Sequence, residues 1–401
     1  MSADDTDREI VDSIERWAER ELRPVARRFD HADEYPEEIV EQMKELGLFG
    51  ATIAPEYGGL GLSASTYARL VMSIASVWMA PVGIFNSHLI MAACVQRNGT
   101  EAQKRKWLPR FATGGIRGGI GLTEPNAGTD LQAIRAVARR DGDDYIIDGT
   151  KTWITNGVYG SCFGVLVKTD PTAEPRHKGM SMFLCEKGPG FKAAKKIRKL
   201  GYKSIDSAEL VFEGFRAPAE NLIGGIEGRG FQHAVGGLEL GRINVAARGA
   251  GIAAGALRDA LRYAQQRETF GKPIAQHQAI QFPLAEMHAE CEMVRHYVFR
   301  TAWEMDRQPH EAVSDQVAIA NYRANRLACN AADLAIQVHG GIGYTRTKAF
   351  EHFFRHHRRY RITEGSDEVQ IRKIAAYLFG FAGPKRRARD KRQAAPDGLG
   401  S

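Results

Sequence analysis

A short acidic turn near the C-terminal end is the strongest candidate for chemistry in the sequence. Glu364 and Gly365 precede Ser366, a good helix N-cap residue, and Asp367 and Glu368 follow it. Carboxylates in a first turn suit the positive end of a helix dipole, so the pattern predicts a helix that begins here. A carboxylate held in such a turn, beside free backbone amides, can act as a base on a bound substrate. Taken alone, a solvated loop acid is the commoner case.

Four more polar stretches contain residue types that suit a flat ring or an anion. Hydroxyls and backbone amides favour a phosphate or a polar ring edge, and Trp153 can lie against a flat ring to which Thr155 donates. Each stretch is a weak signal by itself. They are residues 122–130 (LTEPNAGTD), 151–157 (KTWITNG), 267–272 (RETFGK) and 337–343 (QVHGGIG).

Two other patterns are better explained by packing than by function. Residues 249–254 (GAGIAA) match the dinucleotide fingerprint G-x-G-x-x-A, but that fingerprint needs a preceding strand. Here it lies in a long run with helical periodicity, which indicates small residues for close helix packing. His352, His356 and His357 lie near Arg355. Because no carboxylate or cysteine completes a metal shell, they predict a basic helix face and no metal.

The composition is that of an ordinary globular protein with a sizeable core. The 401 residues are 43% hydrophobic and 26% charged, with a net charge of +7, which suits two or three domains. Much of the positive charge falls in residues 385–392. That cluster could bind nucleic acid, but a solvated tail is the favoured interpretation. Five scattered cysteines indicate a reducing, cytoplasmic setting without disulfides or zinc.

The sequence predicts neither a leader nor a membrane span. The first residues are acidic, where a secretory leader would be basic and then apolar. The most apolar run, 70–95, is interrupted by polar residues and by Pro81. We therefore expect a buried helix, or a helix pair broken at Pro81, rather than a span.

The elements that must position these residues fall into three zones. Residues 7–111 have helical periodicity, with Ser63 or Ser65 as the expected cap of the apolar helix. From 116 to 222, short apolar runs predict strands in an antiparallel barrel or sandwich, with an Asp-Gly turn at Asp148-Gly149. Helices return after residue 228. They are expected at about 238–268, 276–305 and 314–341, from near Thr347, and after Glu364.

In this order and spacing, the stretches resemble the acyl-CoA dehydrogenase family from about Arg8 to Phe379. The resemblance also includes residues 55–61 (PEYGGLG) and 363–373 (TEGSDEVQIRK). It implies an α+β fold with an α-helical N-terminal domain (1–115), a β-barrel middle domain (116–225) and a C-terminal four-helix bundle (226–381). A basic disordered tail (382–401) would follow.

The resemblance further implies an FAD cofactor and a role for each site residue. Glu364 would be the catalytic base, and the family's other base position, just before Arg242, is Gly241 here. Substrate contacts would be Thr129, Glu239, Arg242 and Gly365. Flavin-side contacts would be Leu122, Thr123, Thr129, Trp153 and Thr155. Contacts to the adenine half, often from a neighbouring subunit, would be Arg267, Phe270, Gln278, Gln337, Gly340 and Gly341, with Ser366 and Glu368 on the adenosine side.

The implied reaction is oxidation of an acyl-CoA thioester to the trans-2-enoyl-CoA by α-proton abstraction and β-hydride transfer to flavin N5. The implied partners are an electron-transfer flavoprotein and further copies of the chain in a homotetramer, with no nucleic acid. The alternatives are a catalytic or partner subunit of a heteromeric dehydrogenase, and an acyl-CoA oxidase or flavin monooxygenase on the same fold. Met79 lies where glutaryl-CoA dehydrogenases carry a substrate-binding arginine, which argues against a dicarboxylate substrate.

Overall fold

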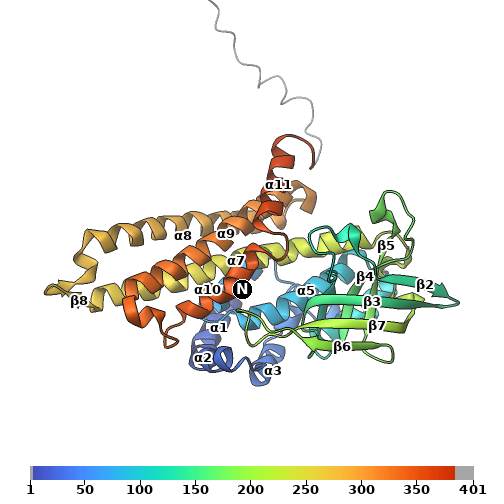
Figure 1. Cartoon of the computed structure of the whole chain (residues 1–401), viewed down its shortest axis with the longest axis horizontal. Helices are drawn as coiled ribbons and strands as arrows, with labels where there is room; N and C mark the ends of the chain where they lie inside the picture. The colour runs from blue at the N-terminus through green and yellow to red at the C-terminus, as the bar shows by residue number, and fades with distance from the viewer. Residues whose placement is uncertain (1–2, 384–401) are drawn as a thin grey trace, which may run out of the picture.

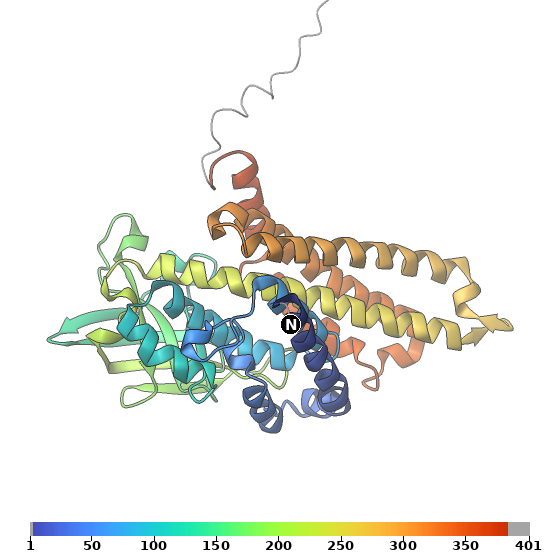
Figure 2. The same ribbon diagram turned by 180° about the vertical axis from the view of Figure 1, so that it is seen from behind.

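The computed structural model describes residues 3–383 and contains the three expected zones. Helices of the N-terminal zone lie between a curled sheet and a set of long C-terminal helices. Figures 1 and 2 show the sheet at one end of the molecule and the tips of the long helices at the other. The structure therefore confirms the predicted fold class, a helical, sheet and helical arrangement.

The N-terminal helices are α1 (Ala3–Trp17), α2 (Arg23–Ala32), α3 (Glu37–Glu45), α4 (Ala64–Ala75), α5 (Ala80–Asn98) and α6 (Glu101–Ala112). The apolar run forms two helices that meet near Pro81, which confirms one of the two expectations. Pro81 lies in the first turn of α5, where a proline removes no helical hydrogen bond. Ser63 caps α4 by accepting a hydrogen bond from the Thr66 N–H. Almost every residue of α5 up to Val95 is buried, so this helix forms the centre of the molecule.

The sheet holds seven strands: β1 (Gly118–Gly121), β2 (Val137–Asp141), β3 (Asp144–Thr155), β4 (Cys162–Lys168), β5 (Met180–Glu186), β6 (Phe191–Lys196) and β7 (Ser207–Pro218). Their order is β1-β4-β2-β3-β7-β6, with β5 also paired to β4. The expectation of a purely antiparallel sheet was wrong, because β4 runs parallel to both β1 and β2. The β2–β3 hairpin reverses the chain, so that β4 returns in the direction of β1.

The predicted Asp-Gly turn at Asp148-Gly149 was also wrong. Strand β3 continues through both residues, with an irregular register there. The hairpin turn lies one Asp-Gly pair earlier, where Gly142 has a φ of +62° between β2 and β3. Gly149 instead allows the backbone of β3 to pack closely against Ala136, since a Cβ at position 149 would lie 2.5 Å from the Ala136 Cβ. Both pairs have the local sequence of a turn, and only strand pairing decides between them.

The C-terminal helices are α7 (Gly230–Gln266), α8 (Gln278–Met305), α9 (His310–His339), α10 (Phe350–Arg358) and α11 (Asp367–Leu378). A small hairpin of β8 (Glu268–Thr269) and β9 (Lys272–Pro273) joins α7 to α8. Helix α7 begins earlier than predicted. Its glycines explain the dinucleotide-like pattern, because a Cβ at Gly249 would lie 2.6 Å from the Ala324 carbonyl and one at Gly251 would lie 2.4 Å from the Met72 carbonyl. The close-packing interpretation is confirmed.

One hydrophobic core joins the two helical zones, and a second lies inside the sheet. The first core runs from α1 to Tyr360 and includes most of α4, α5 and α7. In the described part of the chain, no helix is both long and apolar enough to cross a membrane. The predicted tail lies outside the described residues, apart from its first two positions.

Candidate active site

Glu364 lies in a strained turn between a short 3-10 helix, Arg359–Arg361, and α11. Its φ is +59°, a left-handed conformation that non-glycine residues seldom adopt and that costs on the order of 1–3 kcal/mol. Three contacts hold the turn. Ser366 Oγ accepts from the Val369 N–H at 3.4 Å, and the Glu364 carbonyl accepts from Gln370 Nε2 at 3.1 Å and from Arg242 Nε at 3.2 Å. The predicted N-cap is confirmed, and the turn is fixed from both sides.

The Glu364 carboxylate faces the interior rather than solvent. Oε1 accepts a long hydrogen bond of 3.5 Å from Asn86 Nδ2 on α5. Oε2 is buried and has no partner among the described residues. Burial raises the pKa of this carboxyl, while the guanidinium groups of Arg248, Arg359 and Arg242 oppose the increase. A carboxylate with one free, desolvated oxygen is suited to accept a proton from a bound molecule.

Gly241 lies directly opposite that free oxygen. A Cβ on Gly241 would lie 2.6 Å from Glu364 Oε2 and 2.5 Å from Ile90 Cδ1. The site on α7 that could carry a second base therefore faces the same point as Glu364, but it carries no side chain. Only a small group or hydrogen fits between α7 and the carboxylate.

Glu239 and Arg242, predicted to line the thioester channel, belong to a buried ionic network. Glu239 Oε1 lies 2.6 Å from Arg242 Nη1 and 2.7 Å from Lys373 Nζ, and it accepts from Ser314 Oγ at 2.8 Å. The Glu239 side chain is only 2% exposed, and that of Arg242 is 11% exposed. Glu239 therefore positions Arg242, and Arg242 in turn holds the Glu364 carbonyl.

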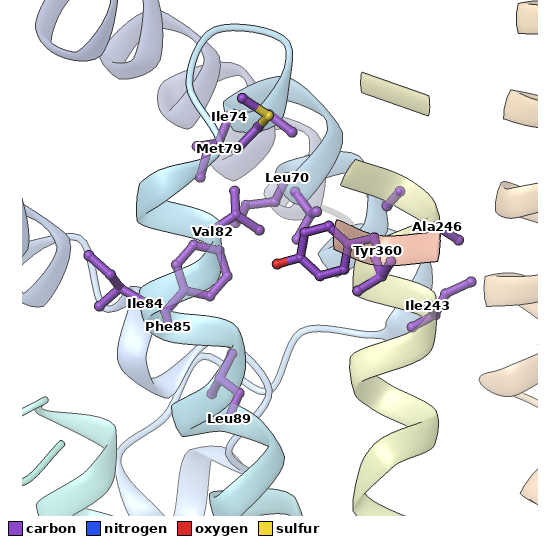
Figure 3. Packing of buried hydrophobic residues seen from close by; sticks show 14 of the residues in the cluster. Leu70, Ile74, Met79, Val82, Ile84, Phe85, Leu89, Ile243, Ala246 and Tyr360 are labelled. Atoms are coloured by element: carbon purple, nitrogen blue, oxygen red, sulfur yellow. The ribbon is translucent and has the colours of Figure 1, made fainter. Parts of the chain in front are cut away.

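Sequence reasoning missed a chain of buried polar groups that leads away from Glu364. Asn86 also lies 3.5 Å from the Tyr67 hydroxyl, which accepts from Asn244 Nδ2 at 2.8 Å. Asn244 Oδ1 accepts from Arg248 Nη2 at 2.6 Å, and Arg248 Nη1 donates to the Tyr360 hydroxyl. Figure 3 shows the Tyr360 ring projecting between α5 and α7. The one feature of the sequence that could have pointed to these groups was Arg248, a charged residue within the small-residue stretch of α7.

The predicted flavin-side residues gather at the near end of the sheet. Trp153 is 56% exposed and has a φ of +63°, at an irregular point in the pairing of β3 with β7. The indole therefore stands free as a flat platform. Thr155, two residues on, is buried with its hydroxyl 3.5 Å from that of Tyr202. Leu122 is buried, Thr123 is half-buried and Thr129 is exposed.

A buried ion pair joins the loop after β1 to β3. Lys151 Nζ lies 2.7 Å from Glu124 Oε1 and donates to the Leu122 carbonyl at 3.2 Å. Glu124 also accepts from the backbone N–H groups of Arg135 and Ala136, at 2.6 Å and 3.0 Å. Burial lowers the pKa of Lys151 to about 8, although Glu124 opposes the change. This pair fixes the loop of residues 122–130 against the strand that carries Trp153.

The predicted adenine-side residues lie at the other end of the molecule. Phe270 is 96% exposed with a φ of +51°, on the turn between β8 and β9. The end of α9 reaches the same place, because His339 stacks on Tyr263 near the end of α7. All six predicted residues are exposed: Arg267, Phe270, Gln278, Gln337, Gly340 and Gly341. Figures 1 and 2 both show β8 at the far end from the sheet.

The residues predicted to hold the cofactor form two separate groups, one suited to a flat ring and one suited to an anionic arm. The sheet offers the exposed Trp153 platform, and the tip of the helices offers an exposed cation and two glycines with no atoms within 4 Å of an added Cβ. Since the halves lie at opposite ends of one chain, a single chain does not bring them together. Ser366 and Glu368, at the start of α11, belong to neither half, and Glu368 is exposed.

The histidine-rich helix α10 differs from the prediction. His352, His356 and His357 are buried rather than on a basic face, and burial lowers the pKa of His352 to about 4 and that of His357 to about 3. The fold also brings two carboxylates, Asp30 and Glu351, to His352. Arg355 engages both carboxylates, at 3.2 Å and 2.6 Å, so the cluster is already neutralised by an arginine.

The arrangement of zones, with a desolvated carboxylate in a strained turn and a free indole on the sheet, defines a class of enzyme that removes a proton beside a flat cofactor. Comparison with known families gives the class a name. Three profiles match: "Acyl-CoA dehydrogenase, N-terminal domain" over residues 4–115, the middle domain over 119–215 and the C-terminal domain over 228–379. The chain belongs to the acyl-CoA dehydrogenase family, whose members are FAD-dependent oxidoreductases.

Individual relatives support the same conclusion. The (2S)-methylsuccinyl-CoA dehydrogenase of Cereibacter sphaeroides is 36% identical over 381 residues, which is 92% of this chain and 69% of that protein. The solved butyryl-CoA dehydrogenase of Megasphaera elsdenii has a TM-score of 0.90 at 33% identity and covers 94% of this chain and 99% of that one. A chain in the structure of the electron transferring flavoprotein of Acidaminococcus fermentans has a TM-score of 0.89 at 35% identity, with 94% and 98% coverage.

Proposed function

We propose that the protein oxidises a short acyl-CoA thioester to the trans-2-enoyl-CoA, with Glu364 as the base. The observation that carries the proposal is the desolvated Oε2 of Glu364, which has no hydrogen-bond partner among the described side chains, those of residues 6–309 and 312–383. The butyryl-CoA dehydrogenase named above has a similar structure and acts on a short acyl group. No observation on this chain favours a partner subunit, an oxidase or a monooxygenase.

The chain's own groups account for binding and proton removal. No backbone carbonyl among the described residues accepts a hydrogen bond from the Glu364 N–H, so this donor would be available to the thioester carbonyl. A donor aimed at that oxygen stabilises the enolate-like charge that develops as the α-proton leaves. Arg242 and Gln370 hold the Glu364 carbonyl and keep the turn rigid. Gly241 lets the Glu364 carboxylate lie close to α7, since a Cβ there would come within 2.6 Å of Oε2.

FAD, when bound, supplies the acceptor for the hydride that leaves Cβ. Leu122, Thr123, Thr129, Trp153 and Thr155 would hold its flavin side. Arg267, Phe270, Gln278, Gln337, Gly340 and Gly341 of a second copy would hold its adenine half, with Ser366 and Glu368 on the adenosine side. Thr129, Glu239, Arg242 and Gly365 would serve the substrate, Glu239 through its contact with Arg242.

The proposed assembly is a homotetramer. One argument is that the two cofactor halves lie at opposite ends of the chain (Figure 1). A second is the outer face of α8, where Phe282 is 61% exposed and Met293 is 66% exposed. Apolar side chains exposed along a long helix are characteristic of a surface that another subunit covers.

The proposed acceptor is an electron-transfer flavoprotein, in keeping with the similar chain found in the structure of such a protein. The proposed setting is cytoplasmic β-oxidation of acyl-CoA. Support comes from five buried cysteines that form no disulfide, as expected in a reducing compartment. The domain boundaries at residues 115, 225 and 381 remain a proposal.

A panel of thioesters tests the reaction. Purified holoenzyme is mixed anaerobically with butyryl-, hexanoyl- and octanoyl-CoA, and bleaching of the flavin is followed, then turnover with an artificial electron acceptor. We expect bleaching by at least the short members, and the enoyl product. An enzyme that keeps its flavin oxidised with every thioester would refute the proposal.

A substitution at the far end tests the shared cofactor site. Arg267→Ala should lose much of its FAD, because it removes an exposed cation from the adenine side. Since Arg267 lies at the opposite end from Trp153, flavin loss means that another copy supplies it. The measurement is the FAD content of the purified tetramer, and an unchanged content would contradict the assignment.

A further inference from the structure

Two guanidinium groups converge on one phenol oxygen beside Glu364. Arg248 Nη1 and Arg359 Nη1 both donate to the Tyr360 hydroxyl, the second at 3.3 Å. Arg248 is fully buried, and its Nε has no hydrogen-bond partner among the described residues. Arg359 is half-buried and lies over the Tyr202 ring, 3.6 Å from its centroid. Of the two, Arg359 is the less buried.

Neither arginine forms an ion pair at contact distance with a carboxylate of the described residues. Two other arginines near the turn are paired: Arg242 with Glu239 at 2.6 Å and Arg361 with Asp367 at 3.0 Å. Among residues 6–309 and 312–383, whose side chains the structure describes, no carboxylate oxygen lies within 4.0 Å of Arg248 or Arg359. The nearby His356 and His357 are buried and neutral, since burial holds their pKa values well below the usual range.

The charge balance beside the base is therefore incomplete. Glu364 is the carboxylate whose charge acts on both arginines, while the phenol groups of Tyr202 and Tyr360 also face Arg359, so the two cations share one carboxylate. A buried cation without a partner is strongly unfavourable, and an added anion of good geometry removes that penalty. A simple alkyl chain supplies no anion to these two guanidiniums.

We propose that the acyl group carries a carboxylate, so that the substrate is the CoA thioester of a short dicarboxylic acid. This inference rests on the proposed dehydrogenase function and concerns the same site. The distal carboxylate would pair with Arg359, supported by Arg248 through Tyr360. A short acyl group is expected, because the buried Tyr360 ring lies between α5 and α7 (Figure 3). Met79, at the position of the substrate-binding arginine of glutaryl-CoA dehydrogenases, argued against a dicarboxylate. Arg248 and Arg359 would supply the guanidinium groups from a different place in the fold.

Matched pairs of substrates test the proposal. Glutaryl-CoA and pentanoyl-CoA have the same carbon skeleton, but one ends in a carboxylate and the other in a methyl group. The measurement is kcat/KM for anaerobic bleaching of holoenzyme flavin. We expect the wild-type enzyme to favour glutaryl-CoA. Arg359→Gln should lower the ratio of the two values by about 10- to 100-fold, the worth of one charge-assisted hydrogen bond.

Two further variants serve as controls. Arg359→Lys keeps the charge and should retain part of the preference. Arg358→Gln removes a neighbouring arginine that does not contact Tyr360 and should leave the ratio unchanged. Arg248 is fully buried, so its substitution risks misfolding and is not the primary test.

The outcomes separate the inference from the function beneath it. A wild-type preference for pentanoyl-CoA, or an Arg359→Gln variant that slows both substrates equally, overturns the carboxylate subsite. The second result would mean that the arginines act on Glu364 or on the flavin. If neither thioester, nor any in the neutral panel, bleaches the flavin, the dehydrogenase proposal itself fails and this inference fails with it.

Discussion

Replacing Glu364 by Gln removes the base while keeping the shape of the side chain and the backbone N–H. General-base removal costs on the order of 100- to 10,000-fold in rate. The structure favours the upper end, because the other nearby acid, Glu239, is engaged by Arg242, Lys373 and Ser314 at 2.6–2.8 Å. Position 241, which faces the same point, carries no side chain. No second group is in place to take the proton.

The assay is anaerobic stopped-flow bleaching of the flavin with butyryl-CoA. The variant should bind FAD and thioester yet bleach at least 1,000-fold more slowly, a figure within the range on the order of 100 to 10,000. Glu368→Gln is the control, since Glu368 is exposed in the capping turn and should affect FAD affinity more than proton removal. Flavin reduction by Glu364→Gln at the wild-type rate would refute the assignment of the base.

The pH dependence gives an independent check. Burial raises the pKa of Glu364 above its ordinary value of 4.5, so wild-type kcat/KM should fall as pH decreases through that raised value. The folded state then holds this proton more tightly than the unfolded chain. Ionised Glu364 therefore lowers wild-type stability as pH rises through the raised pKa. Relative to wild type, Glu364→Gln should gain thermal stability at pH 8 and lose that gain in acid.

Two further predictions follow from the geometry of the site. Gly241→Glu in a Glu364→Gly background should restore measurable bleaching, because a Cβ at position 241 points to within 2.6 Å of the present Oε2; a double variant as inactive as Glu364→Gly alone would contradict this. Glu124→Ala should lower the free energy of unfolding by about 3 kcal/mol at pH 7, since it leaves a buried lysine unpaired. Because Glu124 opposes the lowering of the Lys151 pKa, the variant's lysine should lose its proton at a lower pH than the wild-type value of about 8. The loss, measured by urea unfolding, should therefore shrink as pH rises toward 8, and a loss independent of pH would mean that the ion pair is not the cause.

Some features of the structure could be predicted from the sequence and others could not. The Ser366 cap and the small residues of α7 were readable, because capping and helical periodicity are local properties. The Asp-Gly turn was misplaced, because Asp141-Gly142 and Asp148-Gly149 have the same local chemistry and differ only in strand pairing. The histidines of α10 were misjudged for a related reason, since burial depends on which elements pack against a helix.

By itself, the sequence determined the family resemblance, the three zones and the turn that carries Glu364, since each depends on residues close together in the chain. Only the tertiary structure brought Asn86 and Arg248 to the base, because these residues lie on α5 and α7, far from Glu364 in sequence. It alone revealed that Arg248 and Arg359 share Tyr360 without a carboxylate of their own. Charge balance at a buried site is a sum over neighbours in space, and the order of residues in the chain does not contain that sum.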